Sequence, residues 1–286
     1  MPESIGPAIA RDRLRARLRE LRETRGRTPA DVASSLAWPD GAVEGVESGA
    51  RVLTPLEVEE LLAAYDTDAA EIPLLMSYAR IAWSGRWWAT HRLSGEYQLF
   101  VGHEAEATRI VAYMTSLVPP LQQTRRYALA ATGTILGRPA SHPDVLARAQ
   151  VRAERQRSVA DRLAAGHPIQ VVAIVDDVVL RRPLGGADVM REQLDRLAEE
   201  AEREHVTLVI MPTARGHAGL DGKFEFVELD GGDPAVFLEG PARDYLERDP
   251  RVTGRYREIA DELVSRGVGG ADAVALVRQI RGEIRS

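Results

Sequence analysis

Residues 28–62, TPADVASSLAWPDGAVEGVESGARVLTPLEVEELL, decide the fold of the N-terminal part of the chain. Threonine followed by proline occurs at 28–29 and again at 54–55, and this pair suits the N-cap and first turn of a helix. Between the two pairs, Val43 and Val46 have the i, i+3 spacing of a short helix. The stretch therefore predicts three helices joined by tight turns.

The residues on either side extend this pattern. Residues 11–25 place three leucines at i, i+4 and i+7, which predicts a first helix with one buried stripe among arginines. A fifth helix is expected over 70–81. Five helices with two tight turns fit a helix-turn-helix domain, but periodicity alone also fits a generic helical bundle.

The middle of the chain, 83–166, is also predicted to be helical, with long runs over 104–114 and 144–163. We expect the arginines of the second run to form a solvated face. From residue 169 the pattern changes to β-branched and alternating stretches. Strands are predicted at 169–175, 206–212, 223–229 and 235–240, with helices over 187–204, 251–266 and 271–284.

The predicted fold class is therefore α+β. An all-α helix-turn-helix domain is expected over 1–82. The domain over 83–286 would contain the helical middle segment and a mixed or antiparallel sheet flanked by helices, because its last strands are joined by short turns.

Composition narrows the functional classes. The 286 residues are 44% hydrophobic and 28% charged, with no apolar run of membrane-spanning length and no secretory start, so we expect a cytoplasmic protein. There is no cysteine, and the six histidines lack paired ligand spacing, so neither a metal nor a cofactor is expected. The net charge of −6 means that binding to nucleic acid would need a local basic patch.

Two apparent motifs fail on spacing. The stretch GHAGLDGK (216–223) has five residues between its outer glycines and Phe224 after its lysine, so it is not a phosphate-binding loop. The stretch HEAEA (103–107) has alanine where a zinc-peptidase helix needs its second histidine. No enzyme motif is left.

A polar cluster follows Phe100 and predicts the wall of a small-molecule cavity. On a helix, positions 103, 106, 110 and 113 share one face, with 109 one step around, and Gln122, Gln123, Thr124 and Tyr127 follow soon after. An ordinary alternative is an ion pair of 106 with 109 and tyrosines that cap a core. The candidate ligand residues are His103, Glu106, Arg109, Tyr113, Gln123 and Tyr127, with His103 or Glu106 as a proton-transfer group.

Several separated segments resemble a large actinobacterial family of XRE-type helix-turn-helix regulators, whose C-terminal domain is called WhiJ-like or antitoxin-like. The resemblance rests on YARIAWSGRWW (78–88), FVGHEAEATRIVAY (100–113), LVPPLQQTRRYA (117–128), DDVVLRRPLGGADVMREQLDRL (176–197), MPTARGHAGLDGKFEFVELD (211–230) and VFLEG (236–240). It implies a DNA-binding head, a regulatory C-terminal domain, a homodimer, and a small molecule or a small partner protein as ligand.

The head departs from the family where DNA would be read. In such regulators helix three reads roughly Trp-Ser-x-Ser-Lys-Val-Ser-Arg-Ile-Glu, whereas residues 38–47 here read WPDGAVEGVE. The packing positions match, but the serine, lysine and arginine positions that would contact phosphates and bases do not.

The local charge of the head leads to the same expectation. Residues 28–72 contain ten acids and one base, a net charge of −9, so this surface repels phosphate. Only the arginines of the first helix, Arg15, Arg19 and Arg22 among them, are left to contact a DNA backbone, weakly and without sequence preference.

Three functions remain open at this point. The first is a regulator whose C-terminal domain senses a ligand or partner. The second is a regulator-derived protein that has lost DNA binding and binds or transforms a small molecule in secondary metabolism. The third is a protein-interaction module that uses the acidic head. The family resemblance favours the first function, and the altered third helix favours the second.

Overall fold

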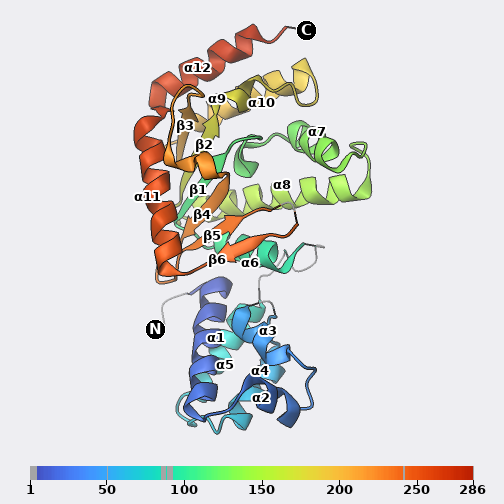
Figure 1. Ribbon diagram of the computed structural model, residues 1–286, viewed down its shortest axis with the longest axis vertical. Coiled ribbons are helices and arrows are strands. Elements are labelled where there is room, and N and C mark those ends of the chain that lie inside the picture. Colours follow the sequence, from blue (N-terminus) through green and yellow to red (C-terminus); the bar gives the residue numbers. More distant parts are fainter. Residues whose placement is uncertain (1–4, 50, 85–87, 89–92, 241, 286) are drawn as a thin grey trace. The chain divides into compact units, whose positions relative to one another are not determined.

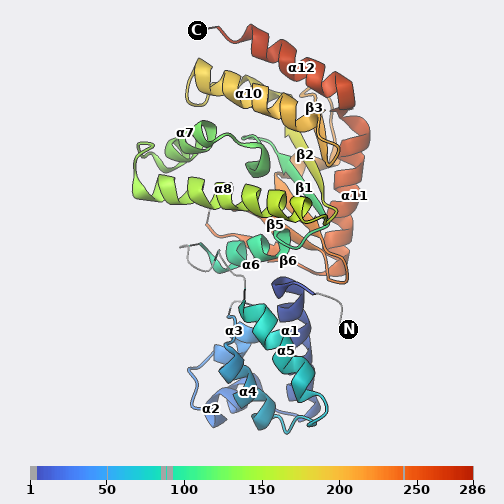
Figure 2. The same ribbon diagram turned by 180° about the vertical axis from the view of Figure 1, so that it is seen from behind.

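The computed structural model describes residues 5–49, 51–84, 88, 93–240 and 242–285 (Figures 1 and 2). They form two compact units. Unit 1 comprises the described residues up to Glu106 together with Gly231–Asp233, and unit 2 comprises Ala107–Asp230 and Pro234 onwards. The predicted domain boundary after residue 82 stays a prediction.

Unit 1 is helical, as the threonine and proline pairs predict. Its α-helices within the described residues are α1 (Pro7–Thr24), α2 (Pro29–Ser35), α3 (Ala42–Ser48), α4 (Pro55–Ala64), α5 (Ile72–Trp83) and α6 (Gly95–Glu104). Thr28 and Thr54 each cap a helix in a capping box, in which the side chain of Asp31 or Glu57 bonds back to the cap. These reciprocal hydrogen bonds fix where α2 and α4 begin.

The core of unit 1 is built from the apolar stripes of the first five helices. Leu14, Leu18 and Leu21 of α1 pack against Val32 of α2 and Val43 of α3. Further core residues come from α4 and α5, namely Val58, Leu61, Leu62, Tyr65, Leu75 and Ala79. The hydrophobic spacing read from the sequence is therefore the spacing of this core.

Unit 2 is built on one mixed seven-stranded sheet with the order β6-β5-β4-β1-β2-β3-β7. The strands are β1 (Arg109–Met114), β2 (Gln170–Asp176), β3 (Val206–Met211), β4 (Phe224–Glu228), β5 (Ala235–Leu238), β6 (Tyr245–Glu247) and β7 (Val268–Gly269). Strands β1, β2 and β3 are parallel, and the other four pair antiparallel. The carboxyl ends of three parallel strands consequently share one edge of the sheet.

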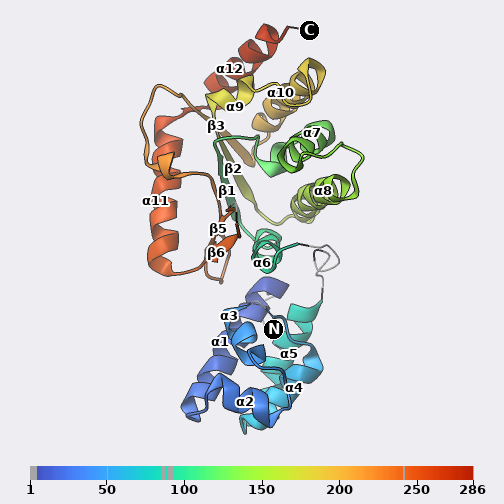
Figure 3. The same ribbon diagram turned by 45° about the vertical axis from the view of Figure 1, so that its right-hand side comes forward.

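Helices cover both faces of this sheet, as Figure 3 shows. Helix α11 (Pro250–Arg266) packs on one face against Val111, Val172 and Phe226. The other face is covered by α7 (Arg125–Leu136), α8 (Pro143–Ala164), α10 (Ala187–Ala201) and α12 (Gly270–Glu283), with the short α9 (Asp177–Arg181) at its edge. The α+β fold class, the helical head and the mixed sheet flanked by helices are confirmed.

Two sequence expectations were wrong. Residues 109–114 form β1 instead of continuing a helix from Glu104, because the run RIVAYM hydrogen-bonds to β2 on one side and to β4 on the other. A short apolar run cannot be assigned by periodicity alone. In addition, Arg155 does not lie on a solvated face of α8. Its side chain is 1% exposed and pairs with Glu225 of β4 beneath the helix.

None of the helices in the described part of the chain is long and apolar enough to cross a membrane.

Candidate functional site

A charged stripe on α10 forms one wall of a groove in unit 2. The helix buries Val189, Leu194 and Leu197 in the core, and so turns its opposite face outward. The i, i+3, i+4 positions of that outward face are all charged: Asp188, Arg191, Glu192, Asp195, Arg196 and Glu199. A helix with this division of residues can present ligand-binding groups without disturbing its own packing.

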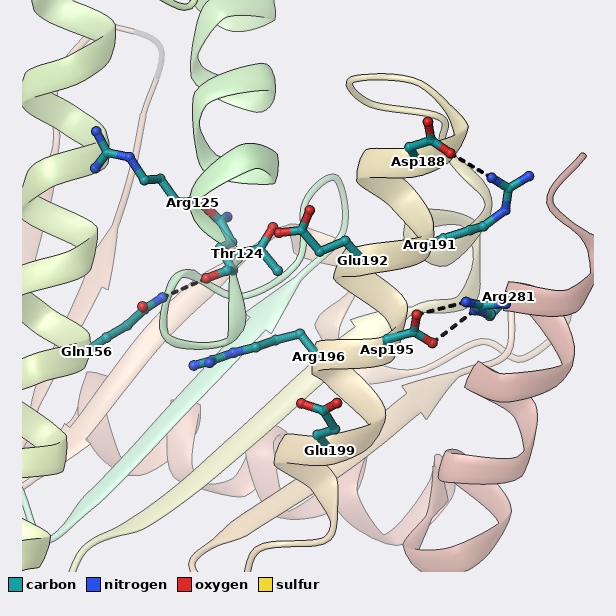
Figure 4. A pocket seen from close by; sticks show the side chains of 11 residues that line it. Thr124, Arg125, Gln156, Asp188, Arg191, Glu192, Asp195, Arg196, Glu199 and Arg281 are labelled. Atoms are coloured by element: carbon teal, nitrogen blue, oxygen red, sulfur yellow. Dashed lines mark hydrogen bonds and ion pairs between the residues drawn. The ribbon is translucent and has the colours of Figure 1, made fainter. Parts of the chain in front are cut away.

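The opposite wall and the end of the groove come from α8 and from the residues before α7. Gln156 projects from α8, and Gln123 to Arg125 lead into α7, where Thr124 is the N-cap. Figure 4 shows Thr124 and Arg125 at the start of α7, with Gln156 pointing to this segment and Arg196 extending from α10. With Arg281 of α12, these residues enclose a groove of 610 Å³.

Two amide side chains hold this segment in place. Buried Gln193 accepts from the Thr124 backbone N–H (2.8 Å) and donates to the Gln122 carbonyl (2.8 Å). Gln156 Nε2 donates to the carbonyls of Pro120 and Gln123, at 2.9 Å each. The segment is thus preorganised by its neighbours, which lowers the entropic cost of binding a ligand.

Most charges that line the groove are already paired. Asp188 bonds to Arg191 (2.8 Å), and both oxygens of Asp195 accept from Arg281 (2.9 and 3.0 Å). Two lining residues pair with side chains beside the groove, Glu192 with Arg126 (2.8 Å) and Arg196 with Glu200 (3.0 Å).

The six predicted ligand residues do not form one cluster. Gln123 lines the groove. Tyr127 is buried below it, where its hydroxyl oxygen accepts from the Val118 N–H (3.2 Å), and burial raises its pKa. Arg109 lies on β1 and pairs with Glu228 (3.5 Å) and with Asp261 of α11 (2.9 Å). The predicted helical face of 103, 106, 110 and 113, with 109 one step around, is ruled out, because β1 begins at Arg109.

His103 and Glu106 belong to unit 1. The imidazole of His103 is 1% exposed, with Nδ1 at 2.7 Å from the Leu99 carbonyl oxygen and Nε2 at 2.9 Å from Asp12 Oδ2. The Glu106 carboxylate accepts from the N–H groups of Ala8 and Ile9 in the first turn of α1, and burial raises its pKa. Both residues therefore connect the end of α6 to α1.

Tyr113 marks a second polar cluster, at the carboxyl ends of the parallel strands. Its buried hydroxyl donates to Asp176 Oδ1 at the end of β2 (3.0 Å), and burial raises the pKa of both groups. The His217 ring stands edge-on to the Tyr113 ring, with centroids 5.7 Å apart. A Cβ at position 219 would lie 2.7 Å from Tyr113, so Gly219 permits this approach.

In the head, the predicted DNA-contacting arginines lie against the C-terminal end of α3. Arg22 bonds to both carboxylate oxygens of Glu47 (2.5 and 3.0 Å), Arg19 donates to the Glu47 carbonyl (3.0 Å), and Arg15 donates to the Ser48 carbonyl (3.4 Å). Cations are favourable at this end of a helix. These contacts hold the third helix, and the side chain of Arg22 is only 10% exposed.

The outward face of α3 carries no base among the described residues. Glu44 and Ser48 are its exposed side chains, and Gly41 begins the helix in the left-handed region (φ 76°) without a side-chain cap. The one base of residues 28–72, Arg51, stacks on Trp38 (4.7 Å to the ring centroid) and pairs with Glu57. The recognition face therefore offers phosphate an acidic surface.

Comparison with known proteins agrees with this two-part organisation. Residues 13–75 match the family described as helix-turn-helix domain, so the head is of the XRE type found in DNA-binding regulators. Residues 97–279 match the family described as Domain of unknown function (DUF5753), and the chain belongs to this family. No curated protein and no solved structure gives a significant match to the chain.

Sequence reasoning missed most of the groove and all partners of Tyr113. The α10 stripe was visible as charges at i, i+3 and i+4, but a charged helix face is usually only solvated. Gln156, Asp176 and His217 lie 33 or more residues from the predicted residues that they join, and only the fold brings them together.

Proposed function

We propose that the chain is a regulator-type protein whose C-terminal domain senses a small polar molecule. The observation that supports this most directly is the 610 Å³ groove between α8 and α10, with its preorganised segment at Gln123 and Thr124. Its volume is in the range of small-molecule sites. The described residues that line it are all polar or charged, so a polar ligand suits it better than an apolar one.

The family resemblance extends this proposal. An actinobacterial WhiJ-like regulator would act as a homodimer and would respond to its ligand through the head. The XRE-type match of residues 13–75 supports a regulator-like head. The acidic recognition face and the use of Arg15, Arg19 and Arg22 within the head argue against a specific operator.

A metabolite screen tests the groove. A bound ligand is expected to raise the unfolding temperature of the whole protein, since ligand at about 100 times its Kd stabilises the folded state by about 2.7 kcal/mol. Arg196→Ala is expected to lose this shift, while Arg203→Ala keeps it, because both arginines pair with Glu200 but only Arg196 lines the groove. Ligands whose shift survives Arg196→Ala would argue against the groove.

A second candidate function is enzymatic and rests on Tyr113, Asp176 and His217. Ligands of open α/β sheets bind outside the carboxyl ends of parallel strands, which is where this cluster lies. A half-buried carboxyl with a raised pKa beside an imidazole has the properties of a proton-transfer pair. The two candidates are separated by recovering each compound from the screen after incubation with the protein. An enzyme of secondary metabolism would consume its compound, and a sensor would return it unchanged.

The head is expected to select no defined sequence from random duplex DNA at physiological salt. Good base contacts contribute about 1–3 kcal/mol each, and α3 offers no basic side chain to make them. Glu44→Ser combined with Gly45→Arg adds positive charge to the same face, and this variant should gain salt-sensitive, unspecific binding. Enrichment of a palindrome by the unmodified protein would refute the expectation.

A further inference from the structure

We propose that the α8–α10 groove recognises a small zwitterion, a molecule of amino-acid or short-peptide chemistry with a carboxylate at one end and an ammonium at the other. This inference rests on the proposed sensing function and names the class of its ligand. It comes from the charges that are left when the ion pairs of the groove are accounted for.

Most of the charged side chains that line the groove already have a partner of opposite charge. Asp188 pairs with Arg191 and Asp195 pairs with Arg281, so these four charges cancel within the groove. Glu192 pairs with Arg126, and Arg196 pairs through one terminal nitrogen with Glu200, while its buried Nε has no described acceptor. Of the charged side chains that line the groove, those of Arg125 and Glu199 have no described ion-pair or hydrogen-bond partner. One cation and one anion therefore remain for a ligand.

The start of α7 strengthens the cationic end. Thr124 caps the Tyr127 N–H, and the N–H groups of residues 125 and 126 have no described acceptor. The positive end of a helix dipole favours an acid in the first turn, yet α7 begins with two arginines and has no acid there. A carboxylate from outside would supply the missing negative charge.

An acceptor lies elsewhere in the groove. Glu199 follows Glu192 by two turns along α10, and Figure 4 shows it beyond Arg196, at the far side of the groove from Arg125. The Glu199 carboxylate lines the groove and suits a ligand ammonium.

The residue types, the charge balance and the length of the groove lining narrow the chemical class of the ligand further. Of the described residues that line the groove, none is aliphatic or aromatic, so the groove has no apolar side chain to pack against a ligand and no ring on which a base could stack. Equal numbers of acids and arginines disfavour a polyanion such as a nucleotide. The stretch of α10 from 188 to 199 is about 16 Å long at 1.5 Å per residue, which leaves room for a few peptide units.

Titration calorimetry of the whole protein with four probes tests the ligand class. Triglycine is expected to bind. N-acetyl-triglycine and triglycinamide, which each lack one terminal charge, should bind about tenfold more weakly, because a charge-assisted hydrogen bond is lost. Free glycine separates the two sources of the chemistry: if it binds as well as triglycine, the groove recognises the charged amino and carboxylate groups of an amino acid, and the peptide units add no affinity.

Matched variants locate the binding. Arg125→Ala and Glu199→Gln should each weaken triglycine binding by about tenfold. Arg148→Ala and Glu204→Gln make the same charge changes at exposed residues that do not line the groove, and should leave binding unchanged. Absence of triglycine and glycine binding at millimolar concentration, equal binding of the capped probes, or insensitivity to Arg125→Ala would overturn the zwitterion proposal. A different metabolite that loses its effect in Arg196→Ala would still support sensing by the groove.

Discussion

Replacing Arg155 by alanine is expected to lower the free energy of unfolding by about 3–5 kcal/mol, the largest single effect that we predict. Arg155 of α8 and Glu225 of β4 are 1% and 7% exposed, and Nη2 lies 2.5 Å from Oε2. Removal of the guanidinium leaves a carboxylate beneath a helix, away from water. Because domains are stable by only about 5–15 kcal/mol, chemical denaturation should detect this loss easily.

Two further variants show whether the stability lost in Arg155→Ala comes from the buried, unpaired charge. The double replacement Arg155→Met with Glu225→Leu removes both charges and should recover most of the lost stability, since hydrophobic replacement of a buried pair is often nearly neutral. Arg278→Ala breaks the exposed Arg278–Glu202 pair and should cost about 0–1 kcal/mol. If Arg155→Ala cost no more than Arg278→Ala, the buried pair would not stabilise unit 2.

Arg155 and Glu225 lie 70 positions apart in the sequence. Contacts of this long range explain why part of unit 2 could not be predicted. Local signals were sufficient for the helices of the head, because caps and apolar stripes lie within a few residues of each other. They were also sufficient for β2 and β3, which are continuous β-branched runs. For β1 they failed, since its identity depends on pairing with strands that lie about 60 and 115 residues away in sequence.

The candidate site shows the same limit more strongly. Gln123 was predicted as a ligand residue and lines the groove, but His103 and Glu106 are used in unit 1. Their spacing to Tyr113 suggested a shared helical face only because β1 was taken for helix. A polar residue can bind a ligand, or it can satisfy the backbone groups of a buried helix end. Its residue type and its spacing in the sequence do not tell these two roles apart.

The carboxylate of Glu106 illustrates this ambiguity. It accepts from two N–H groups at the start of α1, a helix whose own N-cap, Gly6, has no side chain. A Cβ at Gly6 would lie 2.2 Å from the Glu106 side chain, so glycine is needed for the approach. An acid that follows α6 thus performs the capping that a serine or aspartate at position 6 would normally provide.

His103 gives the second large effect. His103→Ala is expected to destabilise unit 1 by about 1.5–3 kcal/mol at pH 7, the range for a hydrogen bond to a charged group. Burial alone would raise the pKa of Asp12, but the hydrogen bond and charge of His103, together with the charges of Arg11 and Arg15, outweigh burial and lower it below 3.8. A lowered carboxyl pKa stabilises the fold above about 3.8, and this contribution is lost as the pH falls through the folded-state value.

The difference between His103→Ala and the unmodified protein should therefore be large at pH 7 and shrink at pH 3, as measured by urea unfolding at both values. His167→Ala removes an exposed imidazole and should change stability by less than about 0.5 kcal/mol at either pH. If His103→Ala left stability unchanged at pH 7, its contact with Asp12 would not explain its burial, and a role in ligand binding would again be the better interpretation. A pH-independent loss would instead assign the effect to packing, since the cavity left by an imidazole does not depend on the charge of Asp12.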